Sequence, residues 1–372
     1  MIVGIDASNL VEGGGKTHLV NLLTSLQPEA HDVRKVVVFG SDRNLLSIED
    51  APWLLKRNIS HLNGGLFARL FWVTFKLNGV AKKERIDILL IPGGIFTCCF
   101  HPSVVICQNL LPFEPQELRR YRISFSKLRL VILRVMYSFS LKSAQGVIFL
   151  TEYARKKVLG KTGQSKTSSL VVRHGVSTGF LREPQLQRSI DDYSIDKPFR
   201  LIYISSVDVY KNHPKVVEAV SALRSSTGWP IVIDFLGKPF PQASKELTDC
   251  LDFHDPAREW AIYHGWRDEP DLNEFLRKSD LGLFASSCEN LPISLLVTMA
   301  SGLPIVSSDL GPMPEILGDS AMYFNPYEAK EIASTLEKAI GSKMRDRVWR
   351  KRVTKDHSVM TGQNAPMTPF LF

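Results

Sequence analysis

The sequence has few cysteines, and their spacing suits neither a disulfide framework nor a zinc site. There are five in 372 residues, an odd number, and no Cys-x-x-Cys pair occurs among them. No apolar run reaches the roughly 20 residues needed to span a bilayer. The first residues, "MIVGIDA", predict a core strand that contains an aspartate, and not a signal peptide. These absences favour a protein of the reducing cytosol.

Acidic residues are scarce in the first half of the chain. Residues 1–190 contain 26 Lys and Arg against 13 Asp and Glu, a net charge of +13, whereas residues 191–372 contain 20 against 25, a net charge of −5, and the two halves sum to +8. The basic excess is densest in 117–157, where apolar residues recur at helical spacing. Three interpretations are open: a solvated helix face, a surface for anionic lipid, or a nucleic-acid patch. No recognised nucleic-acid-binding module is present, and no nucleic-acid partner is expected.

A complete phosphate-binding P-loop is also missing, although "EGGGKT" at 12–17 comes close to one. The motif needs Gly-x4-Gly-Lys-Ser/Thr, and Leu10 stands where its first glycine belongs. Gly13, Gly14 and Gly15 nevertheless separate an expected strand from the amphipathic run "THLVNLLTSL". Such a loop lets the backbone approach a ligand at a helix N-terminus, which attracts anions. A flexible turn between strand and helix is the alternative.

Short β-branched runs alternate with helical patterns, which predicts two α/β domains with parallel sheets. The expected strands lie at 35–40, 86–94, 103–109, 146–151 and 169–175, and then at 200–206, 230–237, 261–265, 281–287 and 303–309. Helices are expected at about 124–143, 213–225, 270–279, 292–301 and 328–341. The polar, proline-broken segment 178–198 predicts a linker. The expected domains therefore cover 1–180 and 195–342, with an atypical tail at 343–372.

The stretch 284–318, "FASSCENLPISLLVTMASGLPIVSSDLGPMPEILG", carries the strongest indication of a binding site. Glu289 and Asn290 open a turn after an expected strand, and Pro292 suits the first turn of the helix that follows. Ligands of such sheets bind beyond the carboxyl ends of the strands. A carboxylate there can accept hydrogen bonds from ligand hydroxyls, and the N–H groups beside it can hold a diphosphate. The alternative is that Glu289 only caps the helix.

On these residues the sequence resembles the retaining glycosyltransferases of the GT-B fold, in the large family called glycosyltransferase group 1 (GT4-like). The likeness covers nearly the whole chain and is strongest in 288–326. Supporting segments are "GGGKTHLVNLL" (13–23), "QNLLPFEP" (108–115), "VIFLTEYARKKV" (147–158), "RHGVS" (173–177) and "YISSVDVYKNH" (203–213). The resemblance implies two Rossmann-like, doubly wound domains that face a cleft. It also implies a nucleotide-sugar donor on the C-terminal domain, an acceptor on the N-terminal domain, and no metal or other cofactor.

The resemblance assigns roles to individual residues of the second half. Lys211 matches the basic residue that contacts the donor diphosphate, and Ser206 stands where relatives often have an arginine. Glu289 matches the first glutamate of a Glu-x7-Glu pattern, which contacts the transferred sugar, and is the assigned catalytic residue. Asn290 and Leu291 follow it and are expected at the donor site.

In the first half, the resemblance matches Gly13, Gly14 and Gly15 to a loop that approaches the donor phosphates. Gln108 and Asn109 stand where many relatives have a histidine, so they are placed on the acceptor side and no base is assigned there. A retaining transfer can use the donor's own phosphate as the base. It requires stabilisation of an oxocarbenium-like transition state and of the departing diphosphate.

Two departures from the family pattern bear on activity. Val297 takes the place of the second glutamate, which in the family holds the nucleotide ribose. If 292–301 is a helix, Val297 lies two turns after Glu289 on roughly the same side, and a glutamate there could reach a ribose. The end of the chain, 357–372, has poor helical periodicity and two prolines, whereas GT-B chains usually end in a helix.

The indicated function is a hexosyltransferase that moves a sugar from a nucleotide-diphosphate sugar to a glycan. A lipid-linked intermediate of surface-polysaccharide or lipopolysaccharide biosynthesis is the expected acceptor. The protein is expected in the cytoplasm, associated peripherally with an anionic membrane surface at its inner face. Two rivals are open: a GT-B protein with impaired catalysis, and a scaffold that binds a nucleotide-sugar without transferring it.

Overall fold

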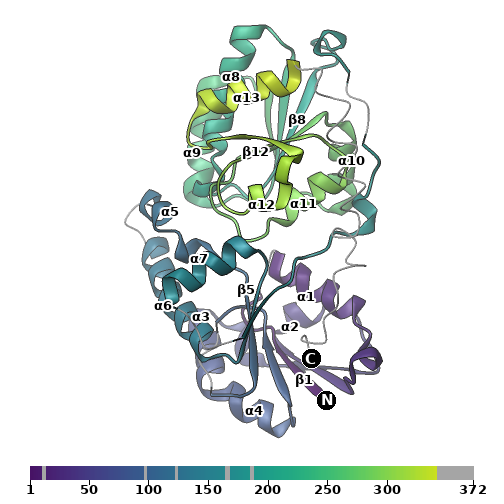
Figure 1. Ribbon diagram of the computed structural model, residues 1–372, viewed down its shortest axis with the longest axis vertical. Coiled ribbons are helices and arrows are strands. Elements are labelled where there is room, and N and C mark those ends of the chain that lie inside the picture. The colour runs from purple at the N-terminus through teal and green to yellow at the C-terminus, as the bar shows by residue number, and fades with distance from the viewer. Residues whose placement is uncertain (11–13, 96–98, 122–124, 164–167, 185–187, 342–372) are drawn as a thin grey trace. The chain divides into compact units, whose positions relative to one another are not determined.

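The computed structural model describes residues 1–10, 14–95, 99–121, 125–163, 168–184 and 188–341. The tail expected at 343–372 therefore lies outside the described residues. The chain divides into two compact units, the first ending at His174 and the second beginning at Gly175, with Arg119–Tyr121 grouped with the second. Each unit is built on one parallel sheet with helices packed against it (Figure 1).

The first sheet has seven parallel strands in the order β3-β2-β1-β4-β5-β6-β7. They are β1 (Ile2–Asp6), β2 (Lys35–Gly40), β3 (Leu54–Asn58), β4 (Ile88–Ile91), β5 (Ser103–Cys107), β6 (Gly146–Phe149) and β7 (Ser168–Val171). The strand order reverses between β1 and β4. In a doubly wound sheet, ligands bind in the crevice beyond the two strands at such a reversal.

The helical elements of the first unit cover both faces of its sheet. They are α1 (Gly14–Ser25), η1 (Pro28–His31), α2 (Asp42–Leu45), η2 (Ser60–Asn63), α3 (Leu66–Phe71), η3 (Trp72–Lys76), α4 (Leu77–Lys83), η4 (Leu111–Phe113), α5 (Pro115–Arg120), α6 (Phe125–Ser143) and α7 (Glu152–Thr162). Of these, η3 is a single turn of π-helix between α3 and α4.

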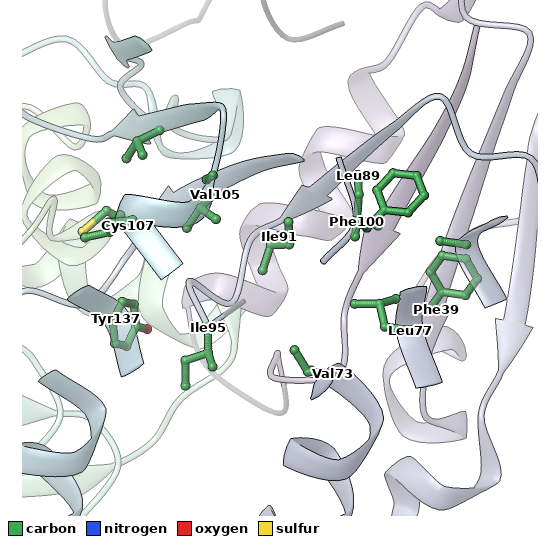
Figure 2. Packing of buried hydrophobic residues seen from close by; sticks show 14 of the residues in the cluster. Phe39, Val73, Leu77, Leu89, Ile91, Ile95, Phe100, Val105, Cys107 and Tyr137 are labelled. Carbon is green, nitrogen blue, oxygen red and sulfur yellow. The ribbon is translucent and has the colours of Figure 1, made fainter. Parts of the chain in front are cut away.

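One face of this sheet carries an extensive cluster of buried hydrophobic residues. Val73 and Leu77 from η3 and α4, and Tyr137 from α6, pack with Ile91 and Val105 of the strands (Figure 2). The crossovers from β3 to β4 and from β5 to β6 run in the same direction across the sheet, and right-handed crossovers then place their helices on the same face. The helices α4 and α6 therefore lie on one side, and α1, which joins β1 to β2, lies on the other.

The second sheet has six parallel strands in the order β10-β9-β8-β11-β12-β13. Its strands are β8 (Phe199–Ile204), β9 (Ile231–Leu236), β10 (Ala261–Gly265), β11 (Leu281–Phe284), β12 (Ile305–Ser308) and β13 (Ala321–Phe324). Its helical elements are η5 (Thr178–Phe180), η6 (Ile190–Asp192), η7 (Val209–Lys211), α8 (His213–Thr227), α9 (Pro241–His254), α10 (Glu269–Lys278), α11 (Ile293–Ala300), α12 (Met313–Leu317), η8 (Gly318–Ser320) and α13 (Ala329–Gly341). Here the order reverses between β8 and β11.

The predicted fold class, two doubly wound α/β domains, is confirmed. Each strand expected from the sequence overlaps a strand of the structure. Two edge strands, β3 and β13, were not among those predicted. The sequence of β3, "LLKRN", has no β-branched residue, so the signal used for the other strands is weak there.

Candidate functional site

The second sheet reverses its strand order between β8 and β11, and the loops after these two strands carry the candidate site. Hydrogen bonds tie the two loops together. The Ser287 backbone N–H donates to the Tyr210 carbonyl oxygen over 2.8 Å, and the Asn212 side-chain amide donates to the Ala285 carbonyl oxygen over 2.8 Å. The two loops therefore form one bonded rim at the place where such sheets bind ligands.

The loop after β8 folds into the 3-10 turn η7, which holds Lys211. Asp208 begins the turn, and its carboxylate accepts the next backbone N–H over 2.7 Å. Asn212 ends the turn in the left-handed conformation, with φ of 54°, which asparagine tolerates better than most residues. The helix α8 then begins at His213 with a proline in its first turn. Lys211 thus lies directly before a helix N-terminus, where anions are favoured.

Lys211 forms an ion pair with Glu289 from the loop after β11. The two side chains are only 7% and 12% exposed. The ammonium also lies 4.8 Å from the ring centre of Tyr210 and 5.8 Å from that of Phe284, within the range of cation–π attraction. A buried ammonium needs an anionic partner, and Glu289 supplies it. The structure thus brings together the two residues predicted to contact the diphosphate and the sugar.

The Glu289 carboxylate affects the neighbouring acids. Burial raises the pKa of Tyr210 well above its ordinary value of 10, and the negative charge of Glu289 raises it further. Burial also raises the pKa of Asp208, against hydrogen bonds and the Lys211 ammonium, which lower it. The rim therefore already disfavours added negative charge. A diphosphate that binds here has to compete with Glu289 for the Lys211 ammonium.

Glycines bring the backbone of neighbouring loops close to this rim. Gly237, after β9, has φ of 155°, and a Cβ there would lie 1.9 Å from the Ser205 carbonyl oxygen. Ser206, which takes the place of the family arginine, is half-buried next to this contact. Gly311, after β12, has φ of 65°, and its Cβ would lie 3.6 Å from the Glu289 backbone nitrogen. The loops after β9 and β12 therefore approach the rim through backbone atoms, which leaves little side-chain bulk at these two contacts.

The remaining expected donor-site residues of this unit are buried. Asn290 and Leu291 are 6% and 7% exposed. Val297 is 6% exposed and belongs to an apolar cluster together with Phe180, Ile202, Leu236, Leu276 and Ala300. The helix α11 begins at Ile293, so Glu289 precedes it and helical periodicity does not relate the side-chain directions of Glu289 and Val297.

In the first unit, the loops after β1, β4 and β5 meet at the carboxyl edge of the sheet. A Cβ on Gly93, after β4, would lie 2.7 Å from the Cβ of Asn9, after β1. A Cβ on Gly15 would lie 2.6 Å from the Gln108 side-chain oxygen. The contact with the Asn9 Cβ excludes a larger residue at Gly93, and the contact at Gly15 would require the Gln108 side chain to move. The glycine loop and Gln108 were predicted separately as donor and acceptor residues, and they are neighbours in the structure.

The structure gives fewer contacts for the other predicted residues of this edge, Gly14 and Asn109. Gly14 begins α1, and Gly13 lies outside the described residues. The Asn109 side-chain oxygen accepts the Leu111 backbone N–H over 3.1 Å, which starts η4. Asn109 therefore has a local structural contact in addition to its predicted place on the acceptor side.

A pair of histidines beside Gln108 was not singled out from the sequence. The Gln108 side-chain nitrogen lies 3.2 Å from His18 Nδ1, and the rings of His18 and His174 are 4.1 Å apart between centres. Burial lowers the pKa of His18 from 6.5 to about 4. Burial, and then the His18 charge, lower the pKa of His174 to about 3. Both imidazoles are therefore neutral at pH 7 and can exchange hydrogen bonds with a hydroxyl group.

Two absences in the described part of the chain concern metal ions and membrane spans. Among the described residues, no group of three His, Cys, Asp or Glu side chains is arranged to hold a metal ion. Over those residues, no helix combines the length and apolar character needed to cross a membrane. Beyond the carboxyl ends of the strands, the structure gathers the Lys211–Glu289 pair in the second unit and the Gln108–His18–His174 group in the first.

Comparisons with known proteins bear on the family match of the second unit and on the fold. Residues 198–342 match the family model described as "Glycosyl transferases group 1". The serotype-specific mannosyltransferase WbdA of Escherichia coli is 22% identical over 246 residues, which cover 64% of this chain but only 29% of WbdA. The O-antigen chain mannosyltransferase B of Escherichia coli is 19% identical over 219 residues, 58% of this chain and 55% of that protein. Among solved structures, Anabaena HepE in complex with UDP has a TM-score of 0.66 at 16% identity, covering 96% of this chain and 95% of HepE.

Proposed function

We propose that the protein is a retaining glycosyltransferase, because the chain has the GT-B fold and residues 198–342 match the model of the group 1 glycosyltransferases. It moves a sugar from a nucleoside-diphosphate sugar to a glycan. The observation that carries the proposal is the buried Lys211–Glu289 ion pair, which lies on the loops after β8 and β11, where the strand order reverses. A cation for phosphate and an acceptor for hydroxyl groups are adjacent there.

The diphosphate of the donor binds Lys211, and the sugar of the donor binds Glu289. The diphosphate draws the Lys211 ammonium away from Glu289, since phosphate oxygens carry more charge than one carboxylate. The N-terminus of α8 lies next to Lys211 and adds its partial positive charge. The released Glu289 carboxylate is buried and needs new donors. The hydroxyl groups of the donor sugar supply them, so the complete donor satisfies both side chains and a free nucleoside diphosphate satisfies only one.

Lys211 also serves the chemical step. As the bond between the sugar and the phosphate breaks, negative charge builds up on the departing diphosphate. A fixed ammonium in a buried site stabilises that charge more strongly than water does. Glu289 holds the sugar while the oxocarbenium-like centre forms, and its negative charge favours the positive centre. The leaving phosphate accepts the proton of the incoming hydroxyl, so no separate base is required.

We propose a mannosyl donor, because the curated relatives are named mannosyltransferases. One of them is named for the O-antigen chain, which supports a surface polysaccharide as the product. The acceptor proposed is a lipid-linked glycan intermediate, which places the protein at the cytoplasmic surface of a membrane. Gln108 and the neutral histidine pair His18–His174 form the polar surface of the first unit that contacts acceptor hydroxyls.

A scaffold that binds a nucleotide-sugar without transferring it is the second candidate. One observation favours it: Val297 stands in the place of the family's second glutamate and lies in an apolar cluster. The ribose then loses a charged acceptor, which can weaken donor binding or misplace the donor. Incubating the purified protein with nucleoside-diphosphate sugars and a glycan acceptor separates the two candidates. Release of nucleoside diphosphate supports the enzyme, and donor binding without release supports the scaffold.

The test of the donor site compares three variants by calorimetric titration with UDP, GDP, their sugars and the free nucleosides. We expect Lys211→Met to weaken binding of every diphosphate by about 10- to 100-fold, because a hydrogen bond to a charged group contributes about 1.5–3 kcal/mol. Binding of a free nucleoside should hardly change. Lys215→Met is the matched control, since this lysine of α8 is 42% exposed and pairs with Glu218.

Glu289→Gln separates the sugar contact from the phosphate contact. Because the variant frees Lys211, we expect a free nucleoside diphosphate to bind at least as well as to the wild type. The preference for the sugar-bearing donor over the free diphosphate should disappear, and transfer should be largely lost. Thermal melts check that both buried variants remain folded. Equal losses for nucleoside and diphosphate in Lys211→Met, or full turnover in Glu289→Gln, contradict the proposed site.

A further inference from the structure

The helix α6 exposes a continuous apolar stripe. Its outward residues are Leu128, Val131, Ile132, Val135 and Phe139, which are 57%, 48%, 50%, 67% and 54% exposed. At about 100° per residue, these five positions fall within one stripe roughly 100° wide. Large apolar side chains that gather on one exposed face mark an interaction site, whereas scattered ones do not.

This stripe is separate from the face by which α6 packs on the sheet. Tyr137 and Leu141 of the same helix are buried in the core cluster, and Leu133 and Met136 pack against it. Leu133, Tyr137 and Leu141 lie on the side of the helix opposite Val135, and Met136 lies on its flank. The helix is therefore apolar on both its inward and its outward side, and the fold itself needs only the inward one.

A second exposed apolar group lies on α3 and η3. Phe67, Phe71 and Phe75 are 87%, 46% and 70% exposed. The rings of Phe71 and Phe75 are in contact, with 5.4 Å between their centres. The neighbouring side chains Trp72 and Val73 point inward and are 3% and 1% exposed. Because η3 and α6 pack into the same core cluster, both apolar groups belong to helices on the same face of the first sheet.

The charged residues of the two helical segments that carry these groups all have one sign. The segment 66–83 contains four Lys and Arg and no Asp or Glu, and the segment 125–143 also contains four and none. Arg129, Lys76 and Lys142 are exposed, and the Lys76 ammonium lies 5.8 Å from the ring centre of Phe71. Exposed aromatic and aliphatic groups therefore alternate with positive charges along both helices.

We propose that α3, η3 and α6 form a docking face for an anionic lipid bilayer. The apolar side chains enter the boundary between head groups and acyl chains, and the Lys and Arg side chains contact the anionic head groups. Insertion of the aromatic groups of η3 and the aliphatic stripe of α6 holds the first unit at the surface without a membrane-spanning segment.

The charge pattern distinguishes a bilayer from a second copy of the chain. A symmetric dimer through α6 would bring this basic helix against its own copy, and like charges across an interface repel. An anionic bilayer complements the same charges. The docking face makes no use of the Lys211–Glu289 site, so its test needs neither donor nor acceptor and is independent of the proposed reaction.

The test is flotation of the full-length protein with two kinds of vesicle, phosphatidylcholine alone and phosphatidylcholine mixed with phosphatidylglycerol. We expect binding to the mixed vesicles at low salt and weaker binding at high salt, because salt screens the charges. The double variant Val135→Glu/Phe139→Glu should lose most of this binding, and Phe75→Glu should reduce it. Replacing one exposed basic residue, as in Lys142→Gln, should weaken binding by about fivefold, from the contribution of about 1 kcal/mol per basic residue near an anionic surface.

Two control variants add the same charge elsewhere. Leu46→Glu changes a leucine that follows α2 and is 85% exposed, and Phe253→Glu changes a phenylalanine of α9 that is 82% exposed. Both should float like the wild type. The proposal is overturned if the α6 double variant floats as well as the wild type, or if either control loses as much binding. A wild-type dimer in light scattering that the α6 variant dissociates, with no vesicle binding, identifies a second copy as the occupant instead.

Discussion

Replacing Val297 by glutamate tests whether the proposed donor site follows the family pattern or the packing of this chain. The family pattern places a glutamate at this position to hold the nucleotide ribose, so the variant should bind a donor more tightly on that ground. The structure places Val297 at 6% exposure among apolar side chains of the second unit. Because Val297 is buried among apolar side chains, we expect Val297→Glu to destabilise the protein and not to strengthen donor binding.

The size of the effect follows from the surroundings of the side chain. Burial in apolar surroundings raises the pKa of a carboxyl group by up to 3–5 units, and each unit corresponds to 1.36 kcal/mol. A rise of about 3 units costs about 4 kcal/mol at pH 7. The larger side chain adds about 1–3 kcal/mol for overpacking. Because a domain unfolds with only about 5–15 kcal/mol, the variant should lose a large part of its stability.

The loss should depend on pH in one direction. A carboxyl group whose pKa is higher in the folded state than in the unfolded state binds its proton more tightly when folded. Its contribution to stability is therefore retained at low pH and lost as pH rises. Urea unfolding at pH 5 and pH 8 should show a larger deficit at pH 8. Val297→Gln has nearly the same size without the charge, so its deficit should be the same at both pH values.

A second measurement gives the result that would refute this reasoning. UDP and GDP are titrated into Val297→Glu and the wild type under conditions where both are folded. A variant as stable as the wild type that binds a nucleoside diphosphate about 10-fold or more tightly shows that the side chain at this position reaches the ribose. The packing of the apolar cluster would then not determine the effect of a glutamate at position 297, and the family pattern would describe the proposed donor site.

Two further substitutions test buried titratable groups. Burial raises the pKa of Asp6 from 3.8 to about 6 against hydrogen bonds from Ser8 and Trp72, so its ionised form costs stability as pH rises. We expect Asp6→Asn to raise the free energy of unfolding at pH 7 by up to about 3 kcal/mol and to give no gain at pH 4, as measured by urea unfolding. His213 is fully buried, neither ring nitrogen has a hydrogen-bond partner among the described residues, and burial lowers its pKa from 6.5 to about 3. His213→Phe should therefore stabilise the protein by about 1–3 kcal/mol at pH 7. Below pH 6.5 the histidine is protonated in the unfolded state but not in the folded state, so the wild type loses stability there. Thermal melts should show a smaller loss for His213→Phe than for the wild type.

The order of strands and helices was predictable because both sheets are parallel and buried on both faces. Such strands read as continuous apolar runs, as in β2, "KVVVFG", and β9, "IVIDFL". The edge strand β3 pairs only with β2, so it needs no such run and was not predicted. The π-helical turn η3 was not predicted either. A one-residue change of helical register leaves no clear mark in an apolar pattern that already covers both sides of the helix.

The candidate site was predictable in part. The resemblance pointed to Lys211 and Glu289, which are 78 residues apart in the chain, and the structure pairs them. The same resemblance gave no role to His18 or His174. His18 lies on α1, which begins at the carboxyl end of β1, and His174 follows β7, so both lie at the carboxyl edge of the same sheet. That contact depends on the packing of the first helix and the last strand, which no local sequence pattern records.

The pairing of Lys211 with Glu289 explains why a site of this kind can be buried without being unstable. Removing either partner leaves the other as an unpaired buried charge, which costs about 3–5 kcal/mol. A ligand with phosphate alone creates the same problem for Glu289, and a free sugar creates it for Lys211. Only a molecule that carries phosphate and hydroxyl groups together restores a partner to both. Under the proposed function, the ion pair therefore favours the intact nucleotide-sugar over either of its parts, and this selectivity comes from the cost of unpaired charge more than from the number of contacts made.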